Sequence, residues 1–169
     1  NFFPMQPETG RLNGGAGLLM LGDGKGGFAP MLERESGILL QGDSRALLVE
    51  DLDGDHRPDL LASVNLGRPQ AFLNRSGRGV PLRLKLSGSP GNLRATGSRI
   101  LLRYRNGRKK ACQLTLGSSY LSAPDPQLFF VQLPGNPVEE VIIRSPLGKE
   151  SSHSLKGASG IVRIPVDTR

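Results

Sequence analysis

The chain has 169 residues, with 22 Lys and Arg against 15 Asp and Glu and a formal net charge of +7. This length accommodates one domain or two small ones. Because 13 Pro and 23 Gly accompany only 5% aromatic residues, we expect many short strands joined by turns, and therefore an all-β protein. The basic residues are spread over turns and alternate strand positions, and two Tyr are too few for a base-stacking platform. We therefore expect no nucleic-acid partner.

Neither a membrane span nor a disulfide is expected. No run approaches the roughly 18 uninterrupted apolar residues that a spanning helix requires. Cys112 is the only cysteine, so an internal disulfide is excluded. It alternates with Leu114 and Leu116, and we interpret it as a core residue rather than a nucleophile.

The first strand pattern, 17–21, follows a lead-in over 1–15 that contains several Pro and Gly. The next run, 22–27, reads Gly-Asp-Gly-Lys-Gly-Gly and formally matches G-x-G-x-x-G. A phosphate-binding fingerprint needs a helix directly after the glycines, whereas Phe-Ala-Pro at 28–30 is not a helix start. We therefore predict a β-turn between two strands.

Four carboxylates follow one another between two short apolar runs, 46–50 and 60–64. They stand at offsets 1, 3, 5 and 9 of one stretch: Asp51, Asp53, Asp55 and Asp59. Calcium takes several oxygen ligands, including backbone carbonyls, and the carbonyl of Arg57 at offset 7 would add one. Without a cation, like charges held this close repel one another strongly. We therefore predict an all-oxygen Ca²⁺ site, with a solvated acidic turn without metal as the alternative.

The flanking runs have no 3.6-residue period, so they indicate buried strands and not the helices of an EF-hand. In this setting the chain resembles the FG-GAP/VCBS repeats of integrin-type β-propellers, whose blades carry Asp-x-Asp-Gly-Asp-x-x-x-Asp between strands. The matching positions are Asp51, Asp53, Gly54, Asp55 and Asp59. His56 replaces the family's usual Gly, and because His tolerates positive φ better than most residues, we expect a strained loop that still forms.

The resemblance implies a propeller blade. From 37 to 74 we predict strand, turn, strand, calcium loop, strand, turn, strand, with 70–74 as the outer strand. Residues 17–74 would then supply about one four-stranded blade, or slightly more. One blade cannot close a propeller, so we expect the remaining blades upstream in a longer protein, or a neighbouring domain that covers the faces.

A polar, Gly-containing linker at 77–80 separates a blade-type domain over 1–76 from a second domain over 81–169. The second domain repeats short apolar runs of period two, separated by turn signals such as Asn106-Gly107. These runs are Leu82/Leu84/Leu86, Ile100/Leu102/Tyr104, Cys112/Leu114/Leu116, Phe129/Val131/Leu133, Val141/Ile143 and the residues 161–166. About six or seven strands predict a small antiparallel β-sandwich or barrel-like domain.

A second resemblance covers this half. Its pattern comprises Leu84-Lys85-Leu86-Ser87-Gly88, Asn92, Gly97, a basic hairpin, 117–122, 138–143 and Pro146-Leu147-Gly148-Lys149. It resembles the ASPIC/UnbV domain, which commonly follows FG-GAP/VCBS blades in secreted proteins similar to cartilage acidic protein. The chain departs from that family at 128–131, where a His-Phe-Gly segment is missing, and at Ser145, where the family has Trp. Ligand contacts by that His or Trp therefore do not carry over.

The sequence offers no supported catalytic grouping. His56 lies in the acidic loop, His153 lies among serines and is expected at the surface, and Asp125 stands between two prolines as a turn residue. Glu139 and Glu140 are adjacent, so on a strand they would point to opposite faces and could not act as an acid/base pair. We expect no enzyme activity.

We therefore expect a non-enzymatic, calcium-stabilised extracellular interaction or adhesion-type module within a larger protein, binding an extracellular protein or polysaccharide. One alternative is an accessory domain of a larger secreted enzyme. Another is an acidic-polysaccharide-binding or nucleic-acid-binding module that uses the basic run 103–110, although a solvated hairpin face explains that run more simply. A rigid loop without a twelfth-position Glu suits millimolar calcium. We expect a secreted or cell-envelope location, with an export leader upstream of Asn1.

Overall fold

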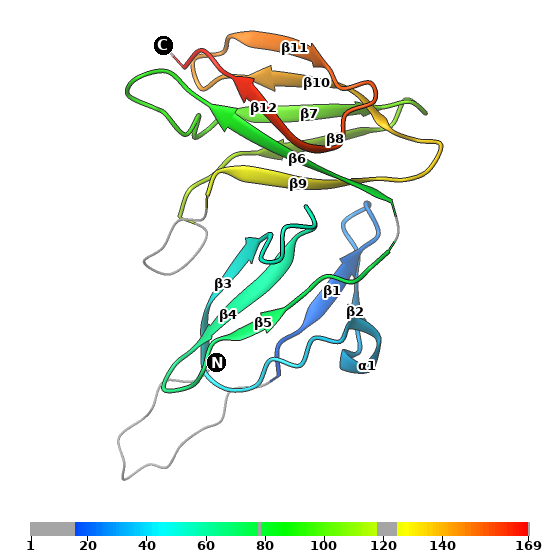
Figure 1. Ribbon diagram of the computed structural model, residues 1–169, viewed down its shortest axis with the longest axis vertical. Helices are drawn as coiled ribbons and strands as arrows, with labels where there is room; N and C mark the ends of the chain where they lie inside the picture. The colour runs from blue at the N-terminus through cyan, green and yellow to red at the C-terminus, as the bar shows by residue number, and fades with distance from the viewer. Residues whose placement is uncertain (1–15, 78, 118–124, 169) are drawn as a thin grey trace. The chain divides into compact units, whose positions relative to one another are not determined.

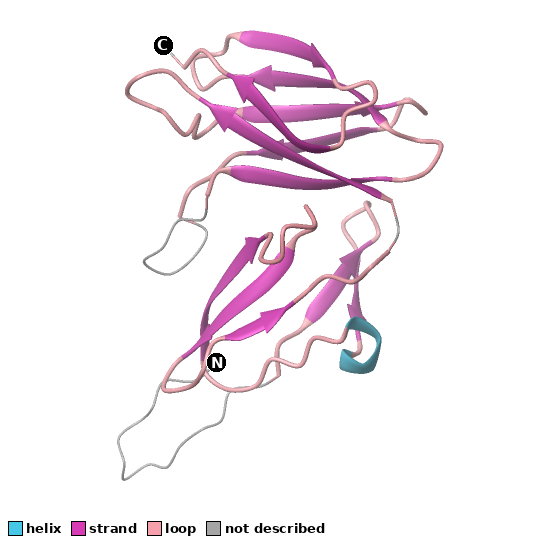
Figure 2. Ribbon diagram, in the orientation of Figure 1, coloured by secondary structure: helices cyan, strands magenta, loops and turns pink. Residues whose placement is uncertain are grey.

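The computed structural model describes residues 16–77, 79–117 and 125–168. Over these residues the chain is all-β, as predicted, with twelve strands and one single-turn helix, α1 (Glu33–Ser36) (Figures 1 and 2). None of the described helical segments is long and apolar enough to cross a membrane. The lead-in 1–15 and the motif residues 118–122 lie outside the described residues.

Internal contacts divide the chain into two compact units. The first comprises residues 1–50 and 59–74, and the second comprises 51–58 and 75–169. The last of the three crossings between the units, between residues 74 and 75, lies shortly before the expected linker at 77–80. The acidic loop belongs by its contacts to the second unit.

The first unit contains two small antiparallel sheets. A hairpin pairs β1 (Leu19–Gly22) with β2 (Phe28–Met31). A three-stranded sheet has the order β3-β4-β5, formed by β3 (Ser44–Glu50), β4 (Asp59–Val64) and β5 (Gln70–Phe72).

The β1–β2 connection confirms the turn predicted for the glycine run. One carboxylate oxygen of Asp23 accepts the N–H groups of Lys25 at 2.6 Å and Gly27 at 3.0 Å. The N–H of Asp23 donates in turn to the carbonyl of Gly27 at 3.0 Å. The run therefore closes a hairpin and does not begin a phosphate-binding helix.

Two predictions for this unit are wrong. No strand forms over 37–43, and residues 17–74 form sheets of two and three strands in place of one four-stranded sheet. The cause is local, because α1 precedes this segment and ends at Gly37 in the left-handed region (φ 71°). The N–H of Gly37 bonds back to the carbonyl of Glu33 at 2.7 Å, which turns the chain out of an extended path.

The second unit is a two-layer β-sandwich. One layer has the order β11-β10-β7-β8 and the other β12-β6-β9 (Figure 1). The strands are β6 (Val80–Ser87), β7 (Arg99–Tyr104), β8 (Lys109–Gln113), β9 (Gln127–Gln132), β10 (Val138–Arg144), β11 (Glu150–Ser154) and β12 (Gly160–Pro165). The expectation of a purely antiparallel domain is wrong at one place, because β12 crosses from the layer of β11 to the other layer and pairs parallel with β6.

The predicted alternation explains the sandwich core. Leu82, Leu84 and Leu86 of β6 are at most 2% exposed. They pack in one cluster with buried residues of β7 and β10 from the other layer, including Leu102 and Val141. Burying each such side chain contributes about 1.5–3 kcal/mol, so the interior between the layers holds this unit together.

The prediction of which side chains of β9 face the core is wrong. The expected apolar face was Phe129, Val131 and Leu133, but Phe130 is 5% exposed whereas Val131 and Leu133 are 37% and 57% exposed. Two adjacent Phe make the period-two pattern ambiguous by one residue, and pairing with β6 decides it. Phe130 lies opposite Leu82, so it takes the core face.

A buried polar residue continues that face. Gln132 is 5% exposed, and its side chain donates to the carbonyl of Ala158 at 2.7 Å and accepts the N–H of Val138 at 2.9 Å. Because both ends of the amide are satisfied, its burial carries little penalty. These two hydrogen bonds explain how a glutamine can occupy the core face of β9.

Residues of the second resemblance shape the loop between β6 and β7. A Cβ at Gly88 would lie 2.0 Å from the carbonyl oxygen of Asn92, so no larger residue fits there. The side chain of Asn92 accepts the N–H of Thr96 and donates to its carbonyl, both at 2.9 Å. The Gly and Asn of this motif therefore have a structural explanation in loop closure.

Candidate metal centre

The acidic loop 51–58 joins β3 to β4, whose ends are paired through Glu50 and Asp59. The strand–loop–strand setting predicted from the sequence is therefore confirmed. Two loop residues adopt the left-handed region, Gly54 at φ 83° and His56 at φ 67°. Positive φ at a non-glycine residue is uncommon but several-fold enriched for His, so the loop forms despite the departure at His56.

Three aspartates converge at the loop. One carboxylate oxygen each from Asp51, Asp53 and Asp59 lies within 4.8 Å of the others. Asp59 is 1% exposed, and its Oδ1 accepts the N–H of Asn74 at 2.7 Å. Calcium–oxygen bonds of 2.3–2.6 Å place opposite ligands about 5 Å apart, so this spacing fits one calcium ion.

The same carboxylates organise the loop backbone. Asp51 accepts the N–H of Gly54 at 2.8 Å on one oxygen and that of His56 at 3.1 Å on the other. Asp53 accepts the N–H of Asp55 at 3.3 Å. These hydrogen bonds hold the loop backbone around the three carboxylates.

Asp55 and Arg57 have other roles in this structure. Asp55 is not in the group of three, and it accepts the backbone N–H of Arg57 at 2.8 Å. The Arg57 guanidinium lies 3.6 Å from that carboxylate and donates to the carbonyls of Ser76 at 2.8 Å and Gly79 at 3.3 Å. Arg57 therefore anchors the loop to the chain that enters β6.

Two further arginines, which sequence reasoning missed, contact the predicted ligands. Arg83 of β6 bonds Asp51 at 2.5 Å, and Arg75 bonds Asp53 at 2.6 Å. The Arg83 side chain is 11% exposed and that of Asp51 is 3% exposed, whereas the Arg75 side chain is 66% exposed. No local pattern could reveal these pairs, because the partners lie 32 and 22 residues apart in the sequence.

Arg83 is itself held in place. Its guanidinium donates to the side-chain oxygen of Gln127 and lies 5.1 Å from the ring centroid of Phe129. The sandwich therefore presents a fixed positive charge to the loop. The prediction counted only carboxylates, but guanidinium groups already offset part of their repulsion, so a bound cation would add to that compensation.

The other reactive residues give no catalytic grouping among the described residues. Cys112 is half-buried against the sandwich core, and burial raises the pKa of its thiol, which disfavours the nucleophilic thiolate. His153 is half-buried beside the hydroxyl of Ser151 at 3.1 Å. Asp125 forms an exposed ion pair with Lys85 at 2.7 Å.

The expectation for Glu139 and Glu140 is corrected. A β-bulge between Val138 and Glu140 breaks the alternation of β10, and both glutamates line one groove on the sandwich. They still do not act as a pair, because Glu139 bonds Arg105 at 3.0 Å and Glu140 bonds Arg103 at 2.9 Å.

Comparison with known proteins assigns the chain to no family. No protein-family model matches the sequence, and no curated protein matches it.

Proposed function

We propose that this chain is a calcium-stabilised, non-enzymatic interaction module of an exported protein. The observation that carries the proposal is the convergence of Asp51, Asp53 and Asp59 within 4.8 Å on a loop between two antiparallel strands. That setting supports the resemblance to FG-GAP/VCBS blades. The sandwich that follows supports the resemblance of the second half to the ASPIC/UnbV domain.

The proposed ion has a structural role. The side chains of Asp51 and Asp53 begin the loop and Asp59 ends it, so an ion bound to all three would fix both ends. Asp55 and the carbonyl of Arg57 remain proposed ligands that would complete a shell of six to eight oxygens. Such a shell holds the loop rigid.

Although the first unit lacks a single four-stranded sheet, its exposed apolar side chains support the interpretation that it belongs to a propeller. Leu47 and Val49 of β3 are 49% and 41% exposed, and Phe28 of β2 is 67% exposed. Propeller blades bury such faces against neighbouring blades. We propose further blades in the longer protein, and an extracellular or cell-envelope location where millimolar calcium fills a site with a Kd of about 10⁻⁴–10⁻³ M.

Thermal unfolding of the whole chain with calcium or with a chelator tests this function. Calcium at about a hundredfold excess over Kd should add about 2.7 kcal/mol to the free energy of unfolding, which raises the melting temperature by several degrees. Magnesium should reproduce little of the rise, because it prefers a smaller, octahedral and partly hydrated shell.

A matched pair of variants locates the effect. Asp53→Asn and Asp125→Asn each remove one carboxylate and one ion pair of similar length, 2.6 Å to Arg75 and 2.7 Å to Lys85. Asp53→Asn should abolish the calcium-dependent rise, and Asp125→Asn should retain it. Equal melting temperatures of the unmutated chain in calcium and in chelator would overturn the proposal.

A further inference from the structure

The outer face of the four-stranded layer carries a polar groove that the calcium loop does not explain. The groove has a volume of about 710 Å³ and lies over β7, β10 and β11 and the β7–β8 hairpin. Its lining residues are Arg103, Tyr104, Arg105, Gly107, Lys109, Glu139, Glu140, Ser152, Ser154 and Lys156. Four cations thus face two carboxylates, so the lining carries a net positive charge.

The four cations of the groove differ in whether they form ion pairs. Arg103 and Arg105 are paired with the two glutamates at 2.9 and 3.0 Å. Lys109 and Lys156 are exposed, and no ion-pair partner is found for either among the residues that the structure describes. The arginines are therefore oriented in advance, and the two lysines are available to an anionic ligand.

One carboxylate of the groove has a lowered pKa. A hydrogen bond from Ser152, together with Arg103, lowers the pKa of Glu140. An ionised carboxylate accepts hydrogen bonds and repels anions. This groove therefore suits a ligand that carries both negative charges and hydroxyl donors.

A second basic pair lies on the same strands. Arg103 pairs with Lys109 across β7 and β8, and Arg99 pairs with Arg144 across β7 and β10. Like charges directly opposite each other on neighbouring strands destabilise a sheet, and Glu140 opposite Arg103 and Glu150 opposite Arg144 offset only part of this charge. Arg103 and Arg99 are four residues apart on one strand, about 13 Å, and Arg99 and Arg144 line an adjoining hollow of about 410 Å³.

We propose that this face binds an acidic polysaccharide, whose carboxylate or sulfate groups pair with the two basic clusters and whose hydroxyls donate to Glu139, Glu140 and the serines. An acidic polysaccharide repeats its negative charges along the chain, so one molecule could contact both basic clusters, which are centred on Arg103 and Arg99 of β7. Nucleic acid fits less well, because Tyr104 is the only aromatic residue of the groove and stacking on several aromatic side chains is typical of single-strand binding.

The inference rests on the proposed function only in naming a ligand for the interaction module. The groove belongs to the sandwich, which has its own core, so binding does not require calcium. The two proposals can therefore fail separately.

The test is calorimetric titration of the whole chain at low salt, in calcium and in chelator. The probes are an octagalacturonate, a heparin octasaccharide, the neutral maltooctaose and an oligo(dT) of eight nucleotides. One or both acidic sugars should bind and weaken as salt rises, and comparison of the two tells whether carboxylates suffice or sulfates are needed. The neutral sugar should not bind, and oligo(dT) should bind more weakly.

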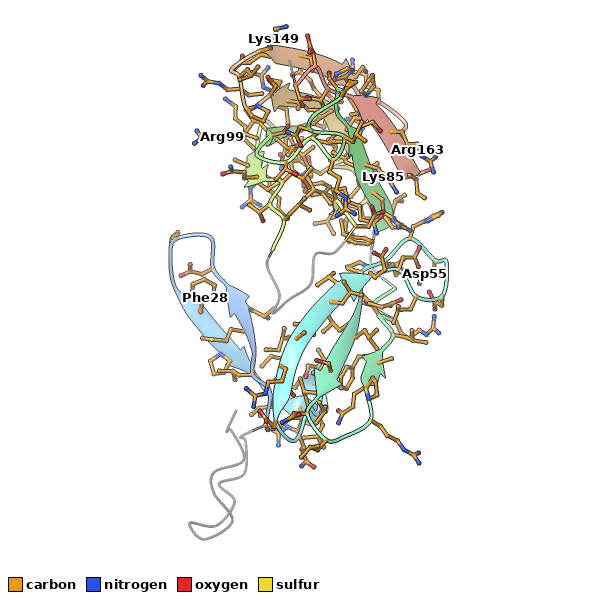
Figure 3. The ribbon with its side chains drawn as sticks, turned by 90° about the vertical axis from the view of Figure 1, so that its left-hand side faces the viewer. Phe28, Asp55, Lys85, Arg99, Lys149 and Arg163 are labelled. Atoms are coloured by element: carbon orange, nitrogen blue, oxygen red, sulfur yellow. The ribbon has the colours of Figure 1, made fainter. Side chains whose placement is uncertain are left out.

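Two double variants of equal charge change locate the site. Lys109→Gln with Lys156→Gln removes the two available groove cations and should weaken acidic-sugar binding on the order of tenfold. Lys25→Gln with Arg163→Gln removes two exposed cations elsewhere and should change it less than about twofold. Figure 3 shows Arg163 on the side of the sandwich away from Arg99.

Three results would overturn the inference: neither acidic octasaccharide binds, both double variants weaken binding alike, or oligo(dT) binds as tightly as the sugars. Binding that persists in chelator while calcium leaves the melting temperature unchanged would support the groove and refute the calcium site. The opposite pattern would refute the groove alone.

Discussion

The sandwich buries mainly apolar side chains, whereas the first unit buries mainly carboxylates. In the sandwich, 14 buried apolar residues from both layers form one cluster. In the first unit, Ala62 is the only buried apolar residue among those described, and the other buried residues are Asp43 at 6% and Asp59 at 1% exposure. Similar strand patterns in the sequence therefore produce a core in one unit and not in the other.

Polar contacts hold the first unit where the core is missing. Asp43 bonds Arg45 at 2.7 Å and Asn65 at 3.0 Å. Burial alone would raise the pKa of Asp43, but the hydrogen bonds from Asn65 and Arg45 outweigh it and lower the pKa. Asp59 likewise accepts the N–H of Asn74. Because few apolar side chains are buried there, we expect the first unit to be less stable by itself than the sandwich.

The largest expected effect comes from separating the units. A fragment of residues 79–169 should fold and unfold cooperatively, because its strands bury a shared interior. A fragment of residues 16–77 should show no cooperative transition, because small sheets without a core are marginal in water. Circular dichroism during heating measures both, and a cooperative melt of 16–77 would contradict the contrast between the units.

A pair of leucine truncations compares the units within the whole chain. Leu102→Ala removes a side chain that is 0% exposed and should lower the free energy of unfolding by about 2–5 kcal/mol. Leu47→Ala removes one that is 49% exposed and should cost less than about 1 kcal/mol. Urea unfolding gives both values, and equal costs would mean that the β3 face is packed in solution.

A pair of arginine substitutions separates buried from exposed charge compensation at the loop. Arg83→Met leaves the nearly buried Asp51 carboxylate without its guanidinium and should cost about 2–3 kcal/mol. Arg75→Met breaks an exposed pair and should cost less than about 1 kcal/mol. Calcium should recover part of the loss in Arg83→Met, since the ion would supply the missing positive charge. Recovery by magnesium to the same extent would argue against a calcium-type shell.

The smallest expected effect is on the pH dependence of stability. Because the pKa of Glu140 is lowered from 4.5 in the folded chain, its contribution to stability is present above that pH and is lost as pH falls through the folded value. Glu140→Gln should therefore melt lower than the unmutated chain near neutral pH, and the difference should shrink as the pH falls below 4.5 and through the lowered pKa of Glu140. Glu150→Gln, on the neighbouring strand β11, is the control; a pH-independent difference for Glu140→Gln would contradict the expectation.

Local sequence patterns predicted the features that depend on local chemistry. The all-β class, the hairpin at 22–27, the strand setting of the acidic loop and the alternation of Leu82, Leu84 and Leu86 all follow from short-range rules of turns and periodicity. His56 was expected to adopt positive φ, and it does. These elements need no information from distant residues.

Features that depend on contacts between residues far apart in the sequence could not be predicted from local patterns. The ion pair of Arg83 with Asp51 joins residues 32 positions apart. The face of β9 was decided by its pairing with β6, because Phe129 and Phe130 satisfy either register. The bulge in β10 brought Glu139 and Glu140 to one groove, and no residue pattern around them marks a bulge.

Calcium titration of the whole chain by isothermal calorimetry tests the central claim most directly. We predict one ion bound per chain with a Kd of about 10⁻⁴–10⁻³ M, loss of that binding in Asp53→Asn, and its retention in Asp125→Asn. Absence of binding at millimolar calcium, or equal binding by the two variants, would show that Asp51, Asp53 and Asp59 form an acidic turn held by arginines and not a metal site.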